Sequence, residues 1–262
     1  MGTALKGIKA VFLDLDGTIY LGGRLIDGAL DFLQRCDGQG VKRFFLSNNS
    51  SRSVQQYVEK LEKMGIPATA DDVLLSTHDC IAWLKHQNIT ETYCVGTEGM
   101  CQMLESEGIT TQSTQPQYVV LGYDTETTYE RLETASIHLH AGVPLMASHP
   151  DMVCPSPDGG LPDVGAFLAL FKATTGVEPV HISGKPNPGM ILHKIEELGL
   201  QPEECAMVGD RLYTDIAMAN RANCMGILVL SGEATEDDVA ILPDGAEQCP
   251  SLIVPSVDAL LR

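Results

Sequence analysis

Residues 9–18 read Lys-Ala-Val-Phe-Leu-Asp-Leu-Asp-Gly-Thr, an apolar run that ends directly in two carboxylates. The run predicts a buried strand, and alternation along the extended chain predicts that Asp14 and Asp16 point the same way. A calcium-binding loop is excluded, because its twelfth place holds Leu25 instead of Glu and its fifth place holds Thr18. Taken alone, the stretch is equally compatible with a solvated Asp-x-Asp-Gly turn.

Apolar runs alternate with helical patterns along the rest of the chain. Strands separated by helices of this length indicate βαβ units and an α/β fold with a parallel sheet. The longest loop is expected at residues 152–165, which hold three prolines and three glycines. Further strands are expected at residues 41–47, 92–96, 118–122, 144–148, 180–183, 205–209 and 226–230, and helices at residues 29–39, 54–61, 128–141, 164–175, 188–199 and 215–222.

The composition is acidic and otherwise typical of a globular protein. The 262 residues include 17 Lys and Arg against 35 Asp and Glu, a net charge of −18. This balance argues against nucleic acid and anionic membranes as partners, since both bind proteins through cationic side chains. Neither a signal peptide nor a membrane span is expected, and eight scattered cysteines suit a reducing compartment, so we expect a cytoplasmic protein of one or two domains.

Polar side chains recur where the predicted strands end. Ser47 and Asn48 follow one strand and precede a helix. They could bind a phosphoryl oxygen at the helix N-terminus, or the segment could only cap the helix. Asp210 follows another strand, and Asp215 starts the next helix, where the helix dipole alone would favour it. Lys185 lies between a strand and a proline-started helix, so a loop can hold it rigidly. Because ligands gather at the carboxyl ends of parallel strands, we expect these groups to meet.

Four converging carboxylates would repel one another and raise each other's pKa values. A hard divalent cation removes this repulsion, and a site with few carboxylates and open water positions suits Mg²⁺. With Mg²⁺ and Lys185 in place, the pocket could accept a phosphate dianion, one carboxylate attacking phosphorus while its neighbour carries the proton.

Over nearly its whole length the chain resembles the haloacid dehalogenase superfamily of phosphatases, and more closely its NagD-like (4-nitrophenylphosphatase) branch. Four signatures carry the resemblance, in this order: the DLDGT stretch at residues 14–18, Ser47-Asn48, Lys185 in GKPNP, and GDRLYTD at residues 209–215. The resemblance implies a doubly wound, Rossmann-like parallel-sheet core of residues 1–78 and 183–262, with an α/β cap domain inserted at residues 79–182.

The resemblance also implies a role for each site residue. Asp14 would be the nucleophile that forms an aspartyl-phosphate, and Asp16 the acid that protonates the leaving oxygen and then activates water. Ser47, Asn48 and Lys185 would hold the transferring phosphoryl group. Magnesium would be bound by the Asp14 carboxylate, the Asp16 main-chain carbonyl and the Asp210 carboxylate. Asp215 would not bind the ion itself but would orient the residues that do.

The chain departs from the branch at one position. Ser148-His149-Pro150-Asp151 places His149 where Asn is usual, so His149 either reaches the substrate's leaving group or only caps a turn. We expect a Mg²⁺-dependent phosphatase of a small phosphorylated metabolite, such as a nucleotide, a sugar phosphate or pyridoxal phosphate. The alternatives are a binding or regulatory module that retains the fold, with incidental phosphatase activity, and a phosphomutase. A homodimer formed through the cap is a further expectation from the branch.

Overall fold

The computed structural model describes residues 5–154 and 159–261 of the chain. The chain forms two compact units and passes between them after Ser47, Tyr57, Leu74 and Gly184. The first unit comprises Met1–Ser47, Val58–Leu74 and Lys185–Arg262, and the second comprises Asn48–Tyr57 and Leu75–Gly184. The assignment of residues 79–182 to a cap stays a prediction.

A six-stranded sheet forms the centre of the first unit. Its strands are β1 (Ala10–Asp14), β4 (Lys42–Ser47), β5 (Val73–Leu75), β12 (Cys205–Gly209), β13 (Met225–Val229) and β14 (Leu252–Val254). They lie in the order β14-β13-β12-β1-β4-β5, and β1 pairs in parallel with both β4 and β12. All five residues of β1 are buried, as expected for a continuous apolar run in a strand covered on both faces.

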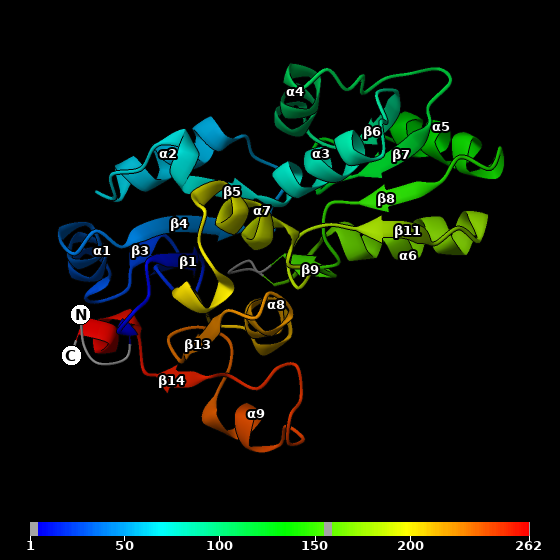
Figure 1. Ribbon diagram of the computed structural model, residues 1–262. Coiled ribbons are helices and arrows are strands. Elements are labelled where there is room, and N and C mark those ends of the chain that lie inside the picture. The colour runs from blue at the N-terminus through cyan, green and yellow to red at the C-terminus, as the bar shows by residue number, and fades with distance from the viewer. Residues whose placement is uncertain (1–4, 155–158, 262) are drawn as a thin grey trace. The chain divides into compact units, whose positions relative to one another are not determined.

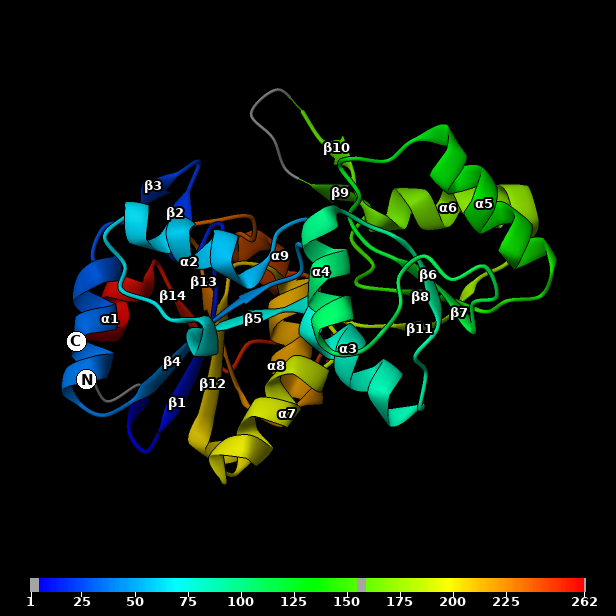
Figure 2. The same cartoon turned by 90° about the horizontal axis from the view of Figure 1, so that it is seen from above.

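Helices cover the two faces of this sheet. In Figure 2, α1 (Ala29–Gly38) lies on one side of β1 and β4, and α7 (Gly189–Leu198) lies on the other. Phe12 shares a core cluster with Ile191 of α7, and Leu13, the next residue of β1, points to the opposite face. The chain also forms α2 (Val54–Lys63), α8 (Ala217–Arg221), α9 (Glu236–Ala240) and a hairpin of β2 (Tyr20–Leu21) and β3 (Arg24–Leu25).

The second unit is a smaller α/β layer structure. Its strands are β6 (Thr92–Val95), β7 (Tyr118–Leu121), β8 (Leu145–Ala147) and β11 (Pro179–Ile182), which pair in parallel in the order β11-β8-β7-β6 (Figure 1). Helices α3 (Ser76–His86) and α4 (Glu98–Ser106) share a core cluster with one face of this sheet, and α5 (Tyr129–His140) and α6 (Val164–Thr175) with the other. A short antiparallel pair, β9 (Val153–Cys154) and β10 (Leu161–Pro162), precedes α6.

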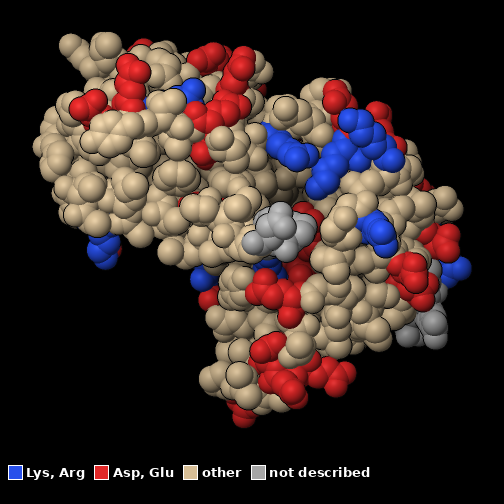
Figure 3. Space-filling view, turned by 180° about the vertical axis from the view of Figure 1, so that it is seen from behind, with Lys and Arg blue, Asp and Glu red and all other residues tan. Residues whose placement is uncertain are grey.

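The predicted fold class is confirmed, because parallel sheets with helices on their faces form both units. The loop expected at residues 152–165 instead contains β9, β10 and the start of α6, while its residues 155–158 lie outside the described part of the chain. Within the described ranges, we find no helix with both the length and the apolarity that crossing a bilayer requires. On the face shown in Figure 3, acidic side chains outnumber basic ones, in line with the net charge.

Candidate active site

The predicted site residues of the first unit lie at the carboxyl end of its sheet. Asp14 ends β1, Ser47 ends β4, and Asp210 directly follows β12. The strand register brings these ends to one level, because Asp14 pairs with Leu46 and Leu13 pairs with Val208. The strands that follow β1 in sequence, β4 and β5, lie on one side of it, and the later strands β12, β13 and β14 lie on the other. Asp14 therefore lies at the topological switch point, where α/β proteins bind ligands.

Lys185 joins two of the acids by direct contacts. Its buried ammonium Nζ contacts Asp14 Oδ1 and lies 2.7 Å from Asp215 Oδ1. Burial alone would lower the pKa of Lys185, but the two carboxylates outweigh it and hold that pKa above its usual range. Lys185 is therefore a permanent positive charge beside the Asp14 carboxylate.

Asp14, Asp210 and Asp215 outnumber Lys185, and the nearby Arg211 guanidinium is paired with Glu233 at 2.8 Å. Burial raises the pKa of Asp14 well above its ordinary value; Lys185 opposes the shift, and the nearby Asp215 and Asp210 add to it. Burial, and after it the charge of Asp215, raises the pKa of Asp210 to about 6. The site thus holds an unbalanced negative charge.

This donor set fits a divalent cation. Asp14, Asp210 and Asp215 each offer a carboxylate oxygen, and these oxygens lie within 4.8 Å of one another. Asp210 Oδ1 is buried and lacks a hydrogen-bond partner among the residues that the structure describes. Both oxygens of Asp215 are engaged, Oδ1 by Lys185 and Oδ2 by the backbone N–H of Arg211 at 3.1 Å. Oxygen donors with excess negative charge suit Mg²⁺, and Asp210 has an oxygen available to it.

Glycines allow the chain to pass close to Asp210. A Cβ on Gly17 would lie 2.3 Å from Asp210 Oδ2, and one on Gly232 would lie 2.0 Å from the same oxygen. Gly17 also has a φ of +88°, which favours glycine. The backbone N–H of Glu233 donates to Asp210 Oδ2 at 2.8 Å, which leaves Oδ1 as the oxygen for a cation. Gly232 and Glu233 could not be predicted from the sequence, because they lie after β13 in a turn without a recognisable motif.

Asp16 differs from Asp14 in its surroundings. Asp14 lies inside the sheet end, whereas Asp16 is exposed in the turn that follows. The backbone N–H of Gly17 donates to the carbonyl of Tyr20 at 2.7 Å, and this bond closes the turn. Asp16 is therefore accessible to solvent, whereas Asp14 is buried.

Two predicted residues, Asn48 and His149, belong to the second unit. Asn48 is buried, and its Nδ2 lies 3.2 Å from Asp151 Oδ2. His149 is fully buried, its Nδ1 2.9 Å from Ser148 Oγ and its Nε2 2.9 Å from Asp163 Oδ1. His149, Asp151 and Asp163 offer ligand atoms within 4.8 Å of one another, but both ring nitrogens of His149 already have protein partners. Contact of His149 with a substrate stays a prediction.

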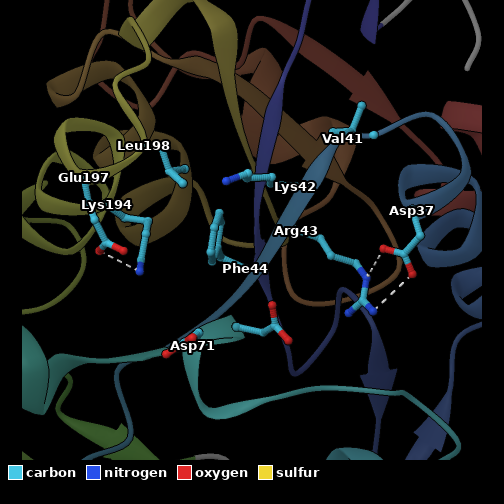
Figure 4. A pocket seen from close by; sticks show the side chains of 11 residues that line it. Asp37, Val41, Lys42, Arg43, Phe44, Asp71, Lys194, Glu197 and Leu198 are labelled. Atoms are coloured by element: carbon cyan, nitrogen blue, oxygen red, sulfur yellow. Dashed lines mark hydrogen bonds and ion pairs between the residues drawn. The ribbon is translucent and has the colours of Figure 1, made fainter.

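A separate cavity of about 560 Å³ lies at the amino end of β4, the end of that strand opposite Ser47 (Figure 4). Four of the seven charged residues that line it form two ion pairs. Arg43 Nε lies 2.8 Å from Asp37 Oδ1, and Lys194 Nζ lies 2.8 Å from Glu197 Oε2. None of the active-site residues predicted from the sequence lines this cavity.

Comparisons with known proteins show the family to which the chain belongs. The family model described as haloacid dehalogenase-like hydrolase matches residues 11–110, and a second, HAD-hydrolase-like model matches residues 182–260. An acid sugar phosphatase of Staphylococcus saprophyticus is 33% identical over 237 residues, which cover 90% of this chain and 91% of the relative. The chain therefore belongs to the haloacid dehalogenase-like hydrolases, as its motifs predict.

Solved structures give the same result. A 4-nitrophenylphosphatase from Thermotoga maritima superposes with a TM-score of 0.92 at 38% identity and covers 98% of this chain and 97% of its own. A glycerol phosphate phosphatase from Mycobacterium tuberculosis, solved in complex with magnesium, has a TM-score of 0.91 at 28% identity. That match covers 99% of this chain and 79% of the mycobacterial one.

Proposed function

We propose that the chain is a magnesium-dependent phosphatase of a small phosphorylated metabolite that acts through an aspartyl-phosphate at Asp14. The observation that carries this proposal is the buried cluster in which Lys185 contacts Asp14 and Asp215 beside the open Oδ1 of Asp210. The predicted enzyme class, a phosphoric monoester hydrolase, is confirmed by the phosphatases among its relatives.

In this mechanism Lys185 contacts Asp14 Oδ1 and opposes the rise in the pKa of that carboxyl, and the ionised group attacks phosphorus through Oδ2. Asp16, exposed beside it, protonates the leaving oxygen and then takes a proton from the attacking water. Ser47 and Asn48 donate hydrogen bonds to the equatorial oxygens of the transferring group.

The Asp14 carboxylate, the Asp16 main-chain carbonyl and the Asp210 carboxylate would hold the magnesium ion, with Asp215 orienting Lys185 and the turn after β12. When bound, the ion supplies positive charge that neutralises both the acids and the phosphoryl oxygens.

Among the three substrate classes expected from the sequence, we favour phosphates of sugars or small polyols. Two relatives support this choice, since one is named an acid sugar phosphatase and the other a glycerol phosphate phosphatase. A panel of phosphorylated sugars, polyols, nucleotides and pyridoxal phosphate tests it, with the highest kcat/KM expected for a sugar or polyol phosphate. A uniformly negligible kcat/KM would favour the binding or regulatory module, and product phosphorylated at a second position would favour the phosphomutase.

The range of the second unit includes the whole predicted cap at residues 79–182, and we propose that this unit acts as the cap domain of a NagD-like phosphatase. All eight cysteines are free thiols, which supports a cytoplasmic location. A homodimer through the cap is proposed from the resemblance alone.

Hydrolysis of 4-nitrophenyl phosphate is expected with Mg²⁺ and not after chelation. The loss should be about a thousandfold or more, because a bound cation contributes several kcal/mol to stabilising the transition state. Release of 4-nitrophenolate measures it, and adding Mg²⁺ back should restore the rate. Full activity in chelator would contradict the metal requirement.

Magnesium affinity is expected to fall as the pH drops below about 6, because the raised pKa of Asp210 leaves its carboxyl protonated there. Because Mg²⁺ must then displace the proton of the Asp210 carboxyl, its affinity should fall by about tenfold for each pH unit below that value. Calorimetric titration of the parent chain at pH 5 and pH 7.5 measures the change. The matched Asp210→Asn variant should bind weakly at both values, and equal affinity of the parent at the two pH values would contradict the assignment.

A further inference from the structure

We propose that Asp151 is a positioning residue for Asn48 and fixes the orientation of its amide. The proposal rests on the function proposed above, from which it takes the role of Asn48 as a donor to the phosphoryl group. All the contacts that carry it lie within the second unit.

The backbone of the loop that carries Asp151 is held against α6. The N–H of Gly165 donates to the carbonyl of Asp151 at 2.8 Å, and the N–H of Asp163 donates to the carbonyl of Met152 at 3.2 Å. A Cβ on Gly165 would lie 2.6 Å from the carbonyl oxygen of Pro150, so the loop approaches α6 more closely than a larger residue would permit. The main chain at Asp151 is therefore held in place by these backbone contacts.

A buried chain of hydrogen bonds holds the residues just before Asp151. The ring of His149 lies between Asp163 Oδ1 and Ser148 Oγ, at 2.9 Å from each. Ser148 Oγ lies 3.0 Å from Ser50 Oγ, which accepts from the backbone N–H of Tyr123 at 2.8 Å. These bonds are consistent in direction when His149 donates to Asp163 and accepts from Ser148. They tie the loop at residues 148–151 to the segment that follows Asn48.

Asp151 then reaches Asn48 itself. Asn48 Nδ2 lies 3.2 Å from Asp151 Oδ2 and 3.4 Å from Oδ1. An ionised carboxylate only accepts hydrogen bonds, so it must face the amide nitrogen and not the amide oxygen.

The rest of Asn48 is held from other directions. Its Oδ1 lies 2.7 Å from the position a Cβ would take on Gly184, and Ser76 Oγ donates to its main-chain carbonyl at 2.7 Å. Asp151 contacts the amide nitrogen and so favours one orientation of the amide over the other. Without it, the amide could turn its oxygen toward the phosphoryl group and repel it.

A double-mutant cycle tests the proposal with 4-nitrophenyl phosphate as substrate and orthovanadate as a mimic of the transferring phosphoryl group. Asp151→Ala is expected to lower kcat/KM by about 10- to 100-fold, in the range of a misplaced catalytic contact, and to weaken orthovanadate binding. In the Asn48→Ala background the same substitution should change neither quantity by more than about twofold, since coupled sites are not additive. Thermal melting establishes that each variant is folded.

Asp124→Asn is the matched control, because Asp124 is a buried acid of the same unit that pairs with Arg131 at 3.1 Å. Its effect should be the same with and without Asn48. The proposal is overturned if Asp151→Ala lowers kcat/KM equally in both backgrounds, or leaves the parent unchanged. If Asp14→Asn is inactive but the effects of Asp151→Ala and Asn48→Ala are additive, only the positioning role of Asp151 is rejected. If Asp14→Asn keeps its activity, the proposed function is rejected.

Discussion

Replacing Asp14 with Asn is expected to lower kcat by roughly 10⁴- to 10⁶-fold, the scale seen when a catalytic nucleophile is removed. Asn has nearly the same shape as Asp but cannot attack phosphorus as an anion. The fold should persist, because the substitution removes one negative charge from a cluster in which burial and the neighbouring acids already raise the pKa of Asp14.

Steady-state hydrolysis of 4-nitrophenyl phosphate, together with thermal melting, measures both effects. Asp31→Asn removes an acid from the exposed surface of α1 and serves as the matched control, with unchanged kcat. An active and well-folded Asp14→Asn variant would reject the covalent mechanism.

Replacing Lys185 with Met is expected both to abolish turnover and to destabilise the protein by about 3–5 kcal/mol at neutral pH, the cost of removing one partner from a buried ion pair. The Lys185 side chain is 5% exposed, so water cannot replace its ammonium beside Asp14 and Asp215. The Met side chain fills similar space without charge. Urea denaturation in the absence of metal measures the loss of stability.

The sign of the pH dependence follows from the acids that remain. Burial raises the folded-state pKa of Asp14, and that of Asp210 to about 6, so ionising these two acids opposes folding as the pH rises from their unfolded values through the folded ones. The Met variant should therefore lose more stability at pH 8 than at pH 5. Lys185→Arg, which keeps the charge, should be closer to the parent in stability. A Met variant as stable as the parent at pH 8 would contradict this account of Lys185.

The sequence predicts the elements whose hydrophobic pattern is long or continuous. β1 and β12 are buried along their whole length, and β4 holds the buried apolar run Phe44–Leu46. Helices α1 and α7 repeat their apolar residues at helical spacing. Helices α3 and α4 escape prediction because polar residues interrupt their apolar positions. Their buried faces take shape only against the second sheet.

The candidate site divides in the same way. Asp14, Lys185 and Asp210 could be predicted because each follows or precedes a readable strand and belongs to a motif. The contact between Asn48 and Asp151 could not, since it joins residues 103 positions apart through side chains alone. The approach of Gly232 to Asp210 is likewise set by tertiary packing, and its sequence neighbours give no sign of it.

The net negative charge of the chain does not prevent a positive field at the site. Lys185 and the bound cation would reverse the sign of the field at the carboxyl end of β1, although the chain as a whole carries −18. A phosphate dianion can therefore bind a protein that would repel a polyanion.

Trapping the aspartyl-phosphate shows whether Asp14 carries the transferring phosphoryl group. The Asp16→Asn variant, altered only at an exposed position, should still accept phosphate from 4-nitrophenyl phosphate, because that leaving group needs no protonation. It should then hydrolyse the intermediate slowly, since water lacks its base. After acid quench and peptide mapping by mass spectrometry, we predict a phosphoryl group on Asp14. Phosphate found on another residue, or turnover with Asp14 unmodified at every time point, would contradict the account.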